Sequence, residues 1–334
     1  MRRDLLTIDD LARAELDDLL DHAQSLIAED GAPTTSASLS GKRIAFLFLE
    51  DSTRTRVSFE VAATNVGATV LTFAAGSSSL SKGESLRDTV QTIDAMGMDG
   101  LVVRHRAVGA PEMVARWAGA PVVNAGDGAR SHPTQALLDC LTLRQALGRR
   151  DFAGVRIGFV GDFAHSRVVR SGIVAFAKLG ASVSVIAPPT LLPPDLSSWD
   201  VDVHHDLDAV LHDLDVVYTI RPQAERIAEA LLPSMGEYVA RYGLTNERAA
   251  RLAASTWIME AGPLVRGVQM AAEVADHPRN LMLRQVANGV PVRMAVLESV
   301  MARPRSRAAR EVWSVRPATA GRTDHTSIDV EAGR

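Results

Sequence analysis

Cysteine is almost absent from this chain of 334 residues, which contains Cys140 alone. One thiol excludes an internal disulfide framework and a zinc site built from cysteines, and it fits a reducing cytoplasm, where we expect the protein to reside. Cys140 lies in the apolar stretch ALLDCLTL. Because free cysteine is usually a small core residue, we expect it to be buried in a helix.

Long apolar runs and an excess of positive charge are absent as well. No segment approaches the roughly 18 apolar residues that a membrane span requires. The first residues, MRRDLLTIDDLARAELDDLLDHA, are charged throughout and are typical of an amphipathic helix, not of a signal peptide. The net charge of −4 argues against binding to nucleic acid or to an anionic membrane. Any anionic ligand must therefore be held by local cations.

Short apolar runs alternate with helical patterns along most of the chain, as in parallel α/β units. Several of the runs are apolar on both faces, which is typical of buried parallel strands. The candidate strands are RIAFLFL, TVLTFA, DGLVVRH, APVVNA, VRIGFVG, SVSVIA, VVYTI and TWIME. The pattern predicts an α/β fold with two doubly wound parallel-sheet domains joined by long helices.

The boundary between the two halves is expected along or just after a long helix in SHPTQALLDCLTLRQALGRRDFAG, which ends in a cluster of Gly, Arg and Asp at residues 148–154. QVANGVPVRMAVLESVM predicts a last helix. Residues 303–334 contain few apolar residues and show no period, so they are predicted to be a disordered tail. Its arginines leave contact with RNA or lipid open, but a solvated tail is favoured.

A candidate phosphate site lies in FLEDSTRTRVSFE, where a strand leads into a helix. Ser52 and Thr53 are good N-cap residues, so free backbone N–H groups are expected there. Arg54 and Thr55 add a fork of donors and a hydroxyl in the first turn. Helix N-termini of this kind bind phosphate. A capped surface helix with its arginines in solvent is the alternative.

Other polar groups come directly after predicted strands. Arg104 and His105 end the strand in LVVRHRA, and His132 and Gln135 lie at a strand-to-helix turn in NAGDGARSHPTQALLD. In open parallel sheets, ligands bind beyond the carboxyl ends of the strands. We therefore expect these groups to converge on Arg54, although a purely structural role for His132 is the alternative.

Three further segments supply cations. Lys82 lies in SSSLSKGESLRDT, whose composition is that of a loop closing on an anion or of a plain surface loop. Arg167 opens a helix in GFVGDFAHSRVVRSG, where the third glycine of a dinucleotide site is missing. Arg221 and Gln223 follow a strand in YTIRPQAER and suit a bidentate carboxylate clamp. The adjacent histidines of HHD, residues 204–206, point to opposite sides if extended, and no convincing set of three or four ligands is present, so we expect no metal. With the dinucleotide site discounted as well, we expect no cofactor.

Together these motifs resemble one family, the aspartate and ornithine carbamoyltransferases. The matching segments are STRTR, SKGESLRDT, VVRH, HPTQALLD, GDFAHSRVVRS, RPQAER, GPLVRG and RQVANGVPVRMAVL, in the family's order from about residue 4 to residue 302. RPQAER and SKGE resemble the aspartate branch, and the HCLP signature of the ornithine branch is absent. The resemblance implies transfer of the carbamoyl group of carbamoyl phosphate to the amine of L-aspartate, giving N-carbamoyl-L-aspartate and phosphate for de novo pyrimidine biosynthesis.

The resemblance also implies roles for the candidate residues. For carbamoyl phosphate it implies Ser52, Thr53, Arg54, Thr55, Arg104, His132 and Gln135, with Gly262 and Pro263 in a turn that usually contains a cis proline. For aspartate it implies Lys82, Arg167, Arg221 and Gln223. Ser78 and Lys82 match a loop that enters a neighbouring subunit's site, which implies a homotrimer with shared active sites. A higher assembly with regulatory or other pyrimidine-pathway chains stays open.

The implied domains are residues 1–135 for carbamoyl phosphate, completed by the C-terminal helix 284–302, and residues 136–283 for aspartate. The two substrates bring several negative charges into one pocket, and the candidate arginines and Lys82 offset them. The acceptor amine loses a proton and attacks the carbonyl carbon, and the tetrahedral oxyanion then collapses with loss of phosphate. The expected oxyanion stabilisers are Arg104, His132 and Thr55, which with Arg54 are the expected catalytic residues.

Two departures from the family pattern leave alternatives open. Asp51 replaces the usual proline before STRTR, and a carboxylate there weakens anion binding unless it caps the helix or points away. Glu260 replaces the usual histidine of HPxP, and it would repel aspartate or bind a cationic acceptor. Arg106 in RHR replaces a proline and is expected in the exit loop. The alternatives are a paralogous carbamoyltransferase with a different amine acceptor and a catalytically weak homologue that binds a partner enzyme.

Overall fold

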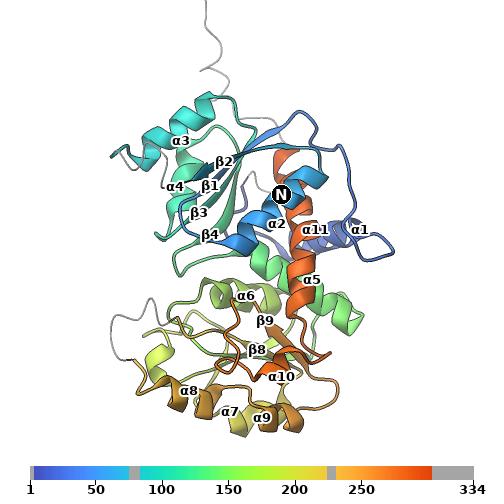
Figure 1. Cartoon of the computed structure of the whole chain (residues 1–334), viewed down its shortest axis with the longest axis vertical. Helices are drawn as coiled ribbons and strands as arrows, with labels where there is room; N and C mark the ends of the chain where they lie inside the picture. The colour runs from blue at the N-terminus through green and yellow to red at the C-terminus, as the bar shows by residue number, and fades with distance from the viewer. Residues whose placement is uncertain (1–3, 75–82, 224–230, 303–334) are drawn as a thin grey trace, which may run out of the picture.

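Two parallel sheets organise the computed structural model of the chain, which describes residues 4–74, 83–223 and 231–302 (Figure 1). The first sheet has the order β2-β1-β3-β4, and the second has the order β7-β6-β5-β8-β9. The strands of the first are β1 (Arg43–Phe48), β2 (Thr69–Ala74), β3 (Gly100–His105) and β4 (Val122–Asp127). Those of the second are β5 (Arg156–Val160), β6 (Ser182–Ile186), β7 (Asp202–His204), β8 (Val216–Thr219) and β9 (Trp257–Glu260).

Each sheet reverses its winding direction at one point. In the first sheet the chain moves from β1 outward to β2 and then returns to β3 on the other side of β1. In the second it moves from β5 through β6 to β7 and returns to β8 beside β5. Loops after the two strands at such a switch point diverge and leave a crevice at the carboxyl edge of the sheet. The two switch points therefore predict where a ligand binds.

Helices cover both faces of the first sheet. On one face, α3 (Leu86–Ala95) and α4 (Ala110–Trp117) bury Val90, Ile93 and Val114 against Leu47 and Val103 of the strands. On the other face lies α2 (Thr53–Asn65), and the buried residues of α2 and of α1 (Arg13–Ser25) belong to a larger apolar cluster. The burial of apolar side chains on both faces explains why these strands read as continuous apolar runs.

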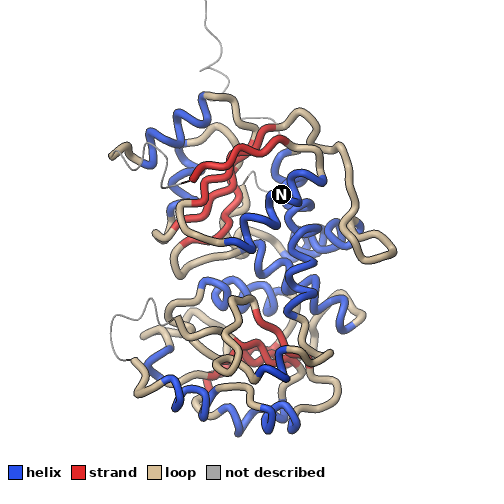
Figure 2. Tube along the Cα trace, in the orientation of Figure 1, coloured by secondary structure: helices blue, strands red, loops and turns tan. Residues whose placement is uncertain are grey.

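Two long helices connect the sheets (Figure 2). The first, α5 (Pro133–Leu147), links β4 to β5 and is buried from Pro133 to Arg144. The second, α11 (Met282–Met301), packs along α5, α2 and α1 and also contacts β9. Because these helices are apolar on most sides, the larger apolar cluster runs through them from α1 into the second sheet. The predicted fold class of two parallel sheets joined by long helices is confirmed.

Shorter helices complete the second half of the chain. They are α6 (Arg167–Lys178), η3 (Pro189–Leu191), α7 (Leu207–Val210), η4 (Leu211–Asp213), α8 (Met235–Tyr242), α9 (Asn246–Arg251) and α10 (Ala272–Ala275). Of these, α6 packs on α5 and follows the loop that leaves β5. The start of α6 is therefore held near the connecting helix.

The strands, helices and buried cysteine predicted from the sequence are confirmed, with two exceptions. All eight candidate runs form strands, and Cys140 is buried in α5 as predicted. The helix predicted for the first residues begins only at Arg13, because Leu5 instead pairs beside β4, donating to Val122 O at 2.9 Å and accepting from Asn124 N at 2.9 Å. The strand β7 was missed, since it has only three residues and no buried side chain. The predicted tail lies outside the described residues.

None of the helices described is both long enough and apolar enough to cross a membrane.

Candidate active site

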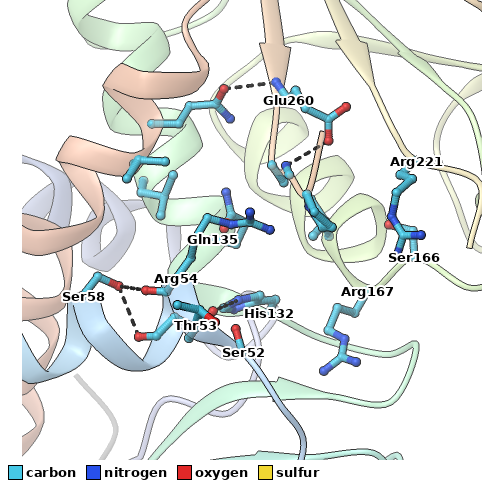
Figure 3. Close-up of a pocket in the computed structure, with 18 of the residues that line it drawn as sticks. Ser52, Thr53, Arg54, Ser58, His132, Gln135, Ser166, Arg167, Arg221 and Glu260 are labelled. Carbon is cyan, nitrogen blue, oxygen red and sulfur yellow. Dashed lines mark hydrogen bonds between the residues drawn. The ribbon is translucent and has the colours of Figure 1, made fainter. Parts of the chain in front are cut away.

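A cavity of about 470 Å3 lies beyond the carboxyl ends of strands from both sheets (Figure 3). All of the described residues that the family resemblance assigned to carbamoyl phosphate or to aspartate line it: Ser52, Thr53, Arg54, Thr55, Arg104, His132, Gln135, Arg167, Arg221, Gln223, Gly262 and Pro263. Ser78 and Lys82 lie outside the described residues. The walls come from the loops after β1, β5, β8 and β9, from the end of β3, and from α5 and α11. The cavity thus joins the switch points of the two sheets.

The N-terminus of α2 forms one wall. Ser52 is the N-cap residue, but its side chain makes no capping hydrogen bond, which leaves the N–H groups of the first turn available at the cavity. The guanidinium of Arg54 lies against Gly262, where a Cβ atom would come within 2.9 Å of Arg54 Cζ. Gly262 also has a φ of +68°, so both its conformation and its close contact favour glycine. Asp51 is exposed and is not the cap.

A carboxylate that the sequence reasoning missed holds two of the cations. Glu50, after β1, accepts from Arg104 Nη2 at 3.2 Å and from Arg167 Nη2 at 2.5 Å. Arg104 also donates to Ala125 O at 3.0 Å, and a Cβ atom at Gly126 would meet both guanidinium groups. Glu50 therefore draws an arginine of the first sheet and an arginine of α6 to one place. A glutamate two residues before the start of STRTR, near a strand end, was the available signal.

His132 is the N-cap residue of α5 and is 4% exposed. Its Nε2 lies 3.4 Å from Thr55 Oγ1, and its backbone N donates to Ser171 Oγ at 2.8 Å. Burial lowers the pKa of His132 well below its usual value, and nearby arginines, first among them Arg104, lower it further. The imidazole is therefore neutral near pH 7, and it can donate one hydrogen bond into the cavity without adding charge.

Gln135 is oriented by a buried network. Its Nε2 donates to Asp139 Oδ1 at 2.9 Å, which leaves the amide oxygen to accept from a ligand. Gln285 of α11 donates to the same oxygen at 2.7 Å, and Tyr218 of β8 donates to Asp139 Oδ2 at 2.8 Å. Burial raises the pKa of Asp139 to about 6, although the three donors oppose the rise. Asp139 thus links α5, α11 and β8 behind the cavity.

Glu260 ends β9 and lines the cavity, yet its side chain is engaged by the protein. Oε2 accepts from Thr219 Oγ1 at 2.8 Å, and Oε1 accepts from Gly262 N at 2.9 Å. Burial raises the pKa of Glu260 to about 7, while Thr219, Gly262, Arg54 and Arg221 act in the opposite direction. The Gly262–Pro263 peptide is cis, as the family resemblance implied. The expected proximity of Glu260 to the candidate site is confirmed.

The opposite wall carries the predicted carboxylate clamp. Arg167 is the first residue of α6 and is 5% exposed, and its buried Nη1 has no hydrogen-bond partner among the residues described. Arg221 and Gln223 follow β8, the strand beside β5. Gln223 is fixed by its backbone N donating to Asp162 Oδ2 at 3.1 Å and its Nε2 donating to His165 O at 3.1 Å. Two arginines thus reach the cavity from adjacent strand ends.

Arg293 of α11 was also missed. It is 3% exposed, lines the cavity, and donates to Gly289 O at 3.1 Å. Burial lowers the pKa of Arg293 to about 9, and Asp139 opposes the shift. No local pattern could place it, because α11 follows β9 in sequence but packs back on α2 and α5. The expectation for His105 was wrong: it does not line the cavity, and its Nδ1 accepts from Ala107 N at 2.8 Å.

Within the described ranges, no group of three or more His, Cys, Asp or Glu side chains is arranged to hold a metal ion. Besides the carboxylates Glu50, Asp51 and Glu260, the cavity is lined by five arginines, several hydroxyl groups and the first turn of α2. Such a set binds phosphate and carboxylate groups and stabilises a developing oxyanion.

Comparison with known proteins places this chain among enzymes with the same architecture. The family model described as the carbamoyl-P binding domain of aspartate/ornithine carbamoyltransferase matches residues 3–145, and the model of the Asp/Orn binding domain matches residues 153–300. The chain is 50% identical over 298 residues to the aspartate carbamoyltransferase catalytic subunit of Frankia casuarinae, covering 89% of this chain and 93% of the relative. It is 49% identical over 294 residues to that of Thermobifida fusca, covering 88% and 93%.

Two solved structures agree with this relationship. Aspartate transcarbamoylase from Trypanosoma cruzi in complex with carbamoyl phosphate and aspartate superposes with a TM-score of 0.78 at 32% identity, covering 89% of this chain and 96% of that chain. Ornithine carbamoyltransferase from Thermus thermophilus superposes with a TM-score of 0.79 at 26% identity, covering 90% and 99%. With both domain models matched and half of the residues shared with curated relatives, the chain belongs to the aspartate/ornithine carbamoyltransferase family.

Proposed function

We propose that this chain is an aspartate carbamoyltransferase, which transfers the carbamoyl group of carbamoyl phosphate to the amine of L-aspartate in pyrimidine biosynthesis. The observation that carries the proposal is a single cavity with a helix N-terminus and Arg54 at one wall and with Arg167 and Arg221 at the other. The first wall suits a phosphate, and the second suits two carboxylates. The curated relatives that are about half identical to this chain carry the same activity in their names.

The phosphate of carbamoyl phosphate binds at the first turn of α2. Backbone N–H groups after Ser52, the hydroxyls of Thr53 and Thr55, and the guanidinium of Arg54 supply its donors. Anions at a helix N-terminus gain from the dipole as well as from these hydrogen bonds. Arg54 also offsets the charge that develops on phosphate as it leaves.

The carbamoyl group lies against Arg104, His132 and Gln135. Arg104 and the neutral imidazole of His132 are donors for the carbonyl oxygen, and Thr55 adds a third. Gln135 O and the backbone carbonyls of the Gly262–Pro263 turn accept from the carbamoyl amine. Donors fixed before the reaction stabilise the tetrahedral oxyanion without reorganisation, and the loss of one such donor typically costs about 10²-fold or more in rate.

Aspartate binds by its carboxylates to Arg167 and Arg221, with Gln223 as a further donor and with Lys82 from the loop outside the described residues. Its amine attacks the carbonyl carbon, a C–N bond forms, and the bond from carbon to the phosphate oxygen breaks. The amine proton leaves with the phosphate dianion. Holding the two substrates in line supplies about 7 kcal/mol or more of the barrier reduction.

The assembly that we propose is a homotrimer with shared sites. Val57 and Val61 of α2 and Leu71 of the edge strand β2 are 45%, 40% and 40% exposed. Exposed apolar groups near an unpaired sheet edge favour coverage by another chain. Ser78 and Lys82, which the family resemblance assigns to a neighbouring subunit's site, lie outside the described residues.

We also propose that residues 1–135, completed by helix 284–302, serve carbamoyl phosphate and that residues 136–283 serve aspartate. The supporting observation is the division of the cavity wall between the ends of the first sheet and the ends of the second. The single buried cysteine supports a cytoplasmic location.

An acceptor with a positive side chain is disfavoured. Glu260, which led us to consider one, uses its two oxygens to accept from Thr219 and Gly262. Its carboxyl group is therefore committed to the protein, while Arg167 and Arg221 remain as the charged groups opposite the α2 wall.

The test is product formation from carbamoyl phosphate by the purified protein, with L-aspartate compared with L-ornithine and putrescine at equal concentration. We expect carbamoylation of aspartate alone, measured as N-carbamoyl-L-aspartate and as released phosphate. Turnover of ornithine or putrescine without turnover of aspartate would move the function to a paralogous transferase. Absence of product with all three acceptors would refute the proposal.

A further inference from the structure

The carboxyl group of Glu260 ties together three parts of the cavity wall. It is 2% exposed at the end of β9. Through Thr219 it contacts the end of β8, and through Gly262 N it holds the cis turn. Its own backbone N donates to Gln285 Oε1 of α11 at 3.1 Å. A change in the charge of Glu260 therefore alters the electrostatic potential in the part of the cavity where the carbamoyl group and the phosphate of the substrate bind.

Charged and titratable groups face Glu260 from several elements. Arg54 approaches from α2 and Arg221 from the loop after β8, and both favour the ionised carboxylate. Tyr238 of α8 and Tyr218 of β8 are close enough for Glu260 to raise the pKa of each, and burial is the larger cause in both. Both phenols are neutral near pH 7, so burial, the hydrogen bonds from Thr219 and Gly262, and the two arginines decide the charge of Glu260.

The hydrogen bonds around Glu260 suit both of its protonation states. As a carboxylate, it accepts from Thr219 Oγ1 and Gly262 N. As a neutral acid, its O–H can donate to Thr219 Oγ1, because the Thr219 hydroxyl has a second acceptor in Met259 O at 3.5 Å. Neither state leaves a buried polar group unpaired, which is the usual penalty for such a change.

We propose that Glu260 is a positioning residue that couples substrate binding to proton uptake: in both protonation states it holds the Gly262–Pro263 turn, and as a carboxylate it also competes with the anionic substrates for Arg54 and Arg221. The inference rests on the proposed function, since it assumes that the cavity binds phosphate and carboxylate groups. Its basis is the contact of Arg54 with Gly262, whose N–H is held by Glu260 itself.

Anions that enter the cavity raise the proton affinity of Glu260, because a second negative charge beside a buried carboxylate disfavours ionisation. By linkage, ligand binding then takes up protons, and affinity falls as pH rises past the point where the free protein loses its proton. That point lies near 7, because the pKa of Glu260 is raised to about 7. If the bound anions favour the protonated state of Glu260 tenfold, affinity weakens about sixfold between pH 6.5 and 8.5, beyond any titration of the ligand itself.

The experiment is calorimetric titration of the whole protein with N-(phosphonacetyl)-L-aspartic acid, the ligand of a related Trypanosoma cruzi structure. Titrations at pH 6.5, 7.5 and 8.5, each in two buffers of different ionisation enthalpy, give affinity and proton uptake together. The variant is Glu260→Gln, whose amide can donate to Thr219 and accept from Gly262, so the turn is retained while the titration is lost. Because both proteins bind the same phosphonate, titration of the ligand changes the affinity of both equally and cancels in the comparison.

The matched control is Glu298→Gln, a carboxylate of α11 that pairs with His22 and does not line the cavity. We expect wild type and Glu298→Gln to lose about sixfold more affinity between pH 6.5 and 8.5 than Glu260→Gln, and to take up more protons at pH 7.5. Equal pH dependence and equal proton uptake in all three proteins would overturn the inference. A wild-type protein that does not bind the analogue at all would instead overturn the proposed function.

Discussion

Arg54 is the residue on which the assigned phosphate site depends. It lies in the first turn of α2, lines the cavity and contacts Gly262. We expect Arg54→Ala to lower kcat/KM for carbamoyl phosphate about 10²-fold or more, because one charged donor to the leaving group is removed. Steady-state kinetics measures the loss, and thermal unfolding should leave Tm nearly unchanged.

The matched control for Arg54 is Arg56→Ala. Arg56 is an exposed arginine of the same helix turn and does not line the cavity. Its Nε lies 3.9 Å from Glu60 Oε1. Surface ion pairs of this kind contribute little, so we expect near-wild-type rates. Activity retained in Arg54→Ala, or lost equally in both variants, would contradict the assignment of Arg54.

The buried carboxyl group of Asp139 predicts how the free energy of unfolding depends on pH. Burial raises the pKa of its carboxyl group to about 6 from 3.8, so the folded state binds this proton more tightly than the unfolded state does. The contribution of Asp139 to the free energy of unfolding is therefore greatest below pH 3.8 and is lost as pH rises through 6, by about 3 kcal/mol in total. Asp139→Asn removes this dependence.

Urea unfolding at several pH values between 4 and 7 checks the Asp139 prediction. We expect the difference in unfolding free energy between Asp139→Asn and wild type to shift in favour of the variant by up to about 3 kcal/mol as pH rises. Parallel curves for the two proteins would show that Asp139 does not titrate in this range. A wild-type curve that rises more steeply than that of the variant would reverse the sign and refute the account.

At the scale of elements, the turn from β5 into α6 is held by close backbone contact. A Cβ atom at Gly161 would lie 2.1 Å from Ile220 O, and the φ of +143° disfavours a side chain. We expect Gly161→Ala to force β5 and β8 apart and to destabilise the fold by about 3 kcal/mol or more. Because Arg167 and Arg221 follow these two strands, KM for aspartate should rise as well.

Gly236→Ala serves as the control for Gly161. Gly236 lies in α8, where a Cβ atom would come no closer than 3.8 Å to its nearest neighbour. Alanine has the higher helix propensity, so this substitution should be neutral or stabilising by up to about 1 kcal/mol. Chemical unfolding and aspartate kinetics on both variants make the comparison. A Gly161→Ala protein as stable as Gly236→Ala would contradict the contact with Ile220.

The sequence predicted the strands well, because buried parallel strands leave a strong apolar signal at RIAFLFL or VRIGFVG. It also predicted the residues that follow the strands, since Arg54, Arg167 and Arg221 stand at strand ends where parallel sheets bind ligands. Two kinds of feature were not predicted from the sequence. The strand β7 is short and unburied, and Leu5 forms its bridge through a contact with β4 that local periodicity does not encode.

The missed site residues share one physical cause. Arg293, Gln285 and Asp139 reach or support the cavity from α11 and α5, whose packing is decided by apolar contacts over long sequence separation. Glu50 lies close to the STRTR motif in sequence. Its role, however, is to accept hydrogen bonds from both Arg104 and Arg167, which only the folded chain brings together. Local sequence therefore predicts the residues that touch ligand better than those that position them.

At the scale of the whole molecule, we expect self-association through the face that carries Val57, Val61 and Leu71. Val61→Glu places a charge in that face, so it should shift a trimer toward monomers and lower activity, because Lys82 would no longer reach a neighbouring site. Sedimentation velocity and specific activity at several concentrations measure both effects.

The control for association is Val203→Glu on β7, a valine of the second sheet that is 41% exposed, against 40% for Val61. The same change in charge there should leave the sedimentation coefficient unchanged. A wild-type protein that sediments as a fully active monomer would rule out the shared-site trimer. Dissociation by Val203→Glu in place of Val61→Glu would move the interface to the other end of the molecule.

The central claim is that one cavity between the two sheets holds both substrates, with phosphate at α2 and carboxylates at α6 and β8. The most direct test is a crystal structure of the whole protein with N-(phosphonacetyl)-L-aspartic acid. The account predicts the phosphonate within hydrogen-bond distance of Arg54 and the first turn of α2, and the two carboxylates on Arg167 and Arg221. An analogue bound outside this cavity, or bound with its phosphonate on Arg167 and Arg221, would contradict the account.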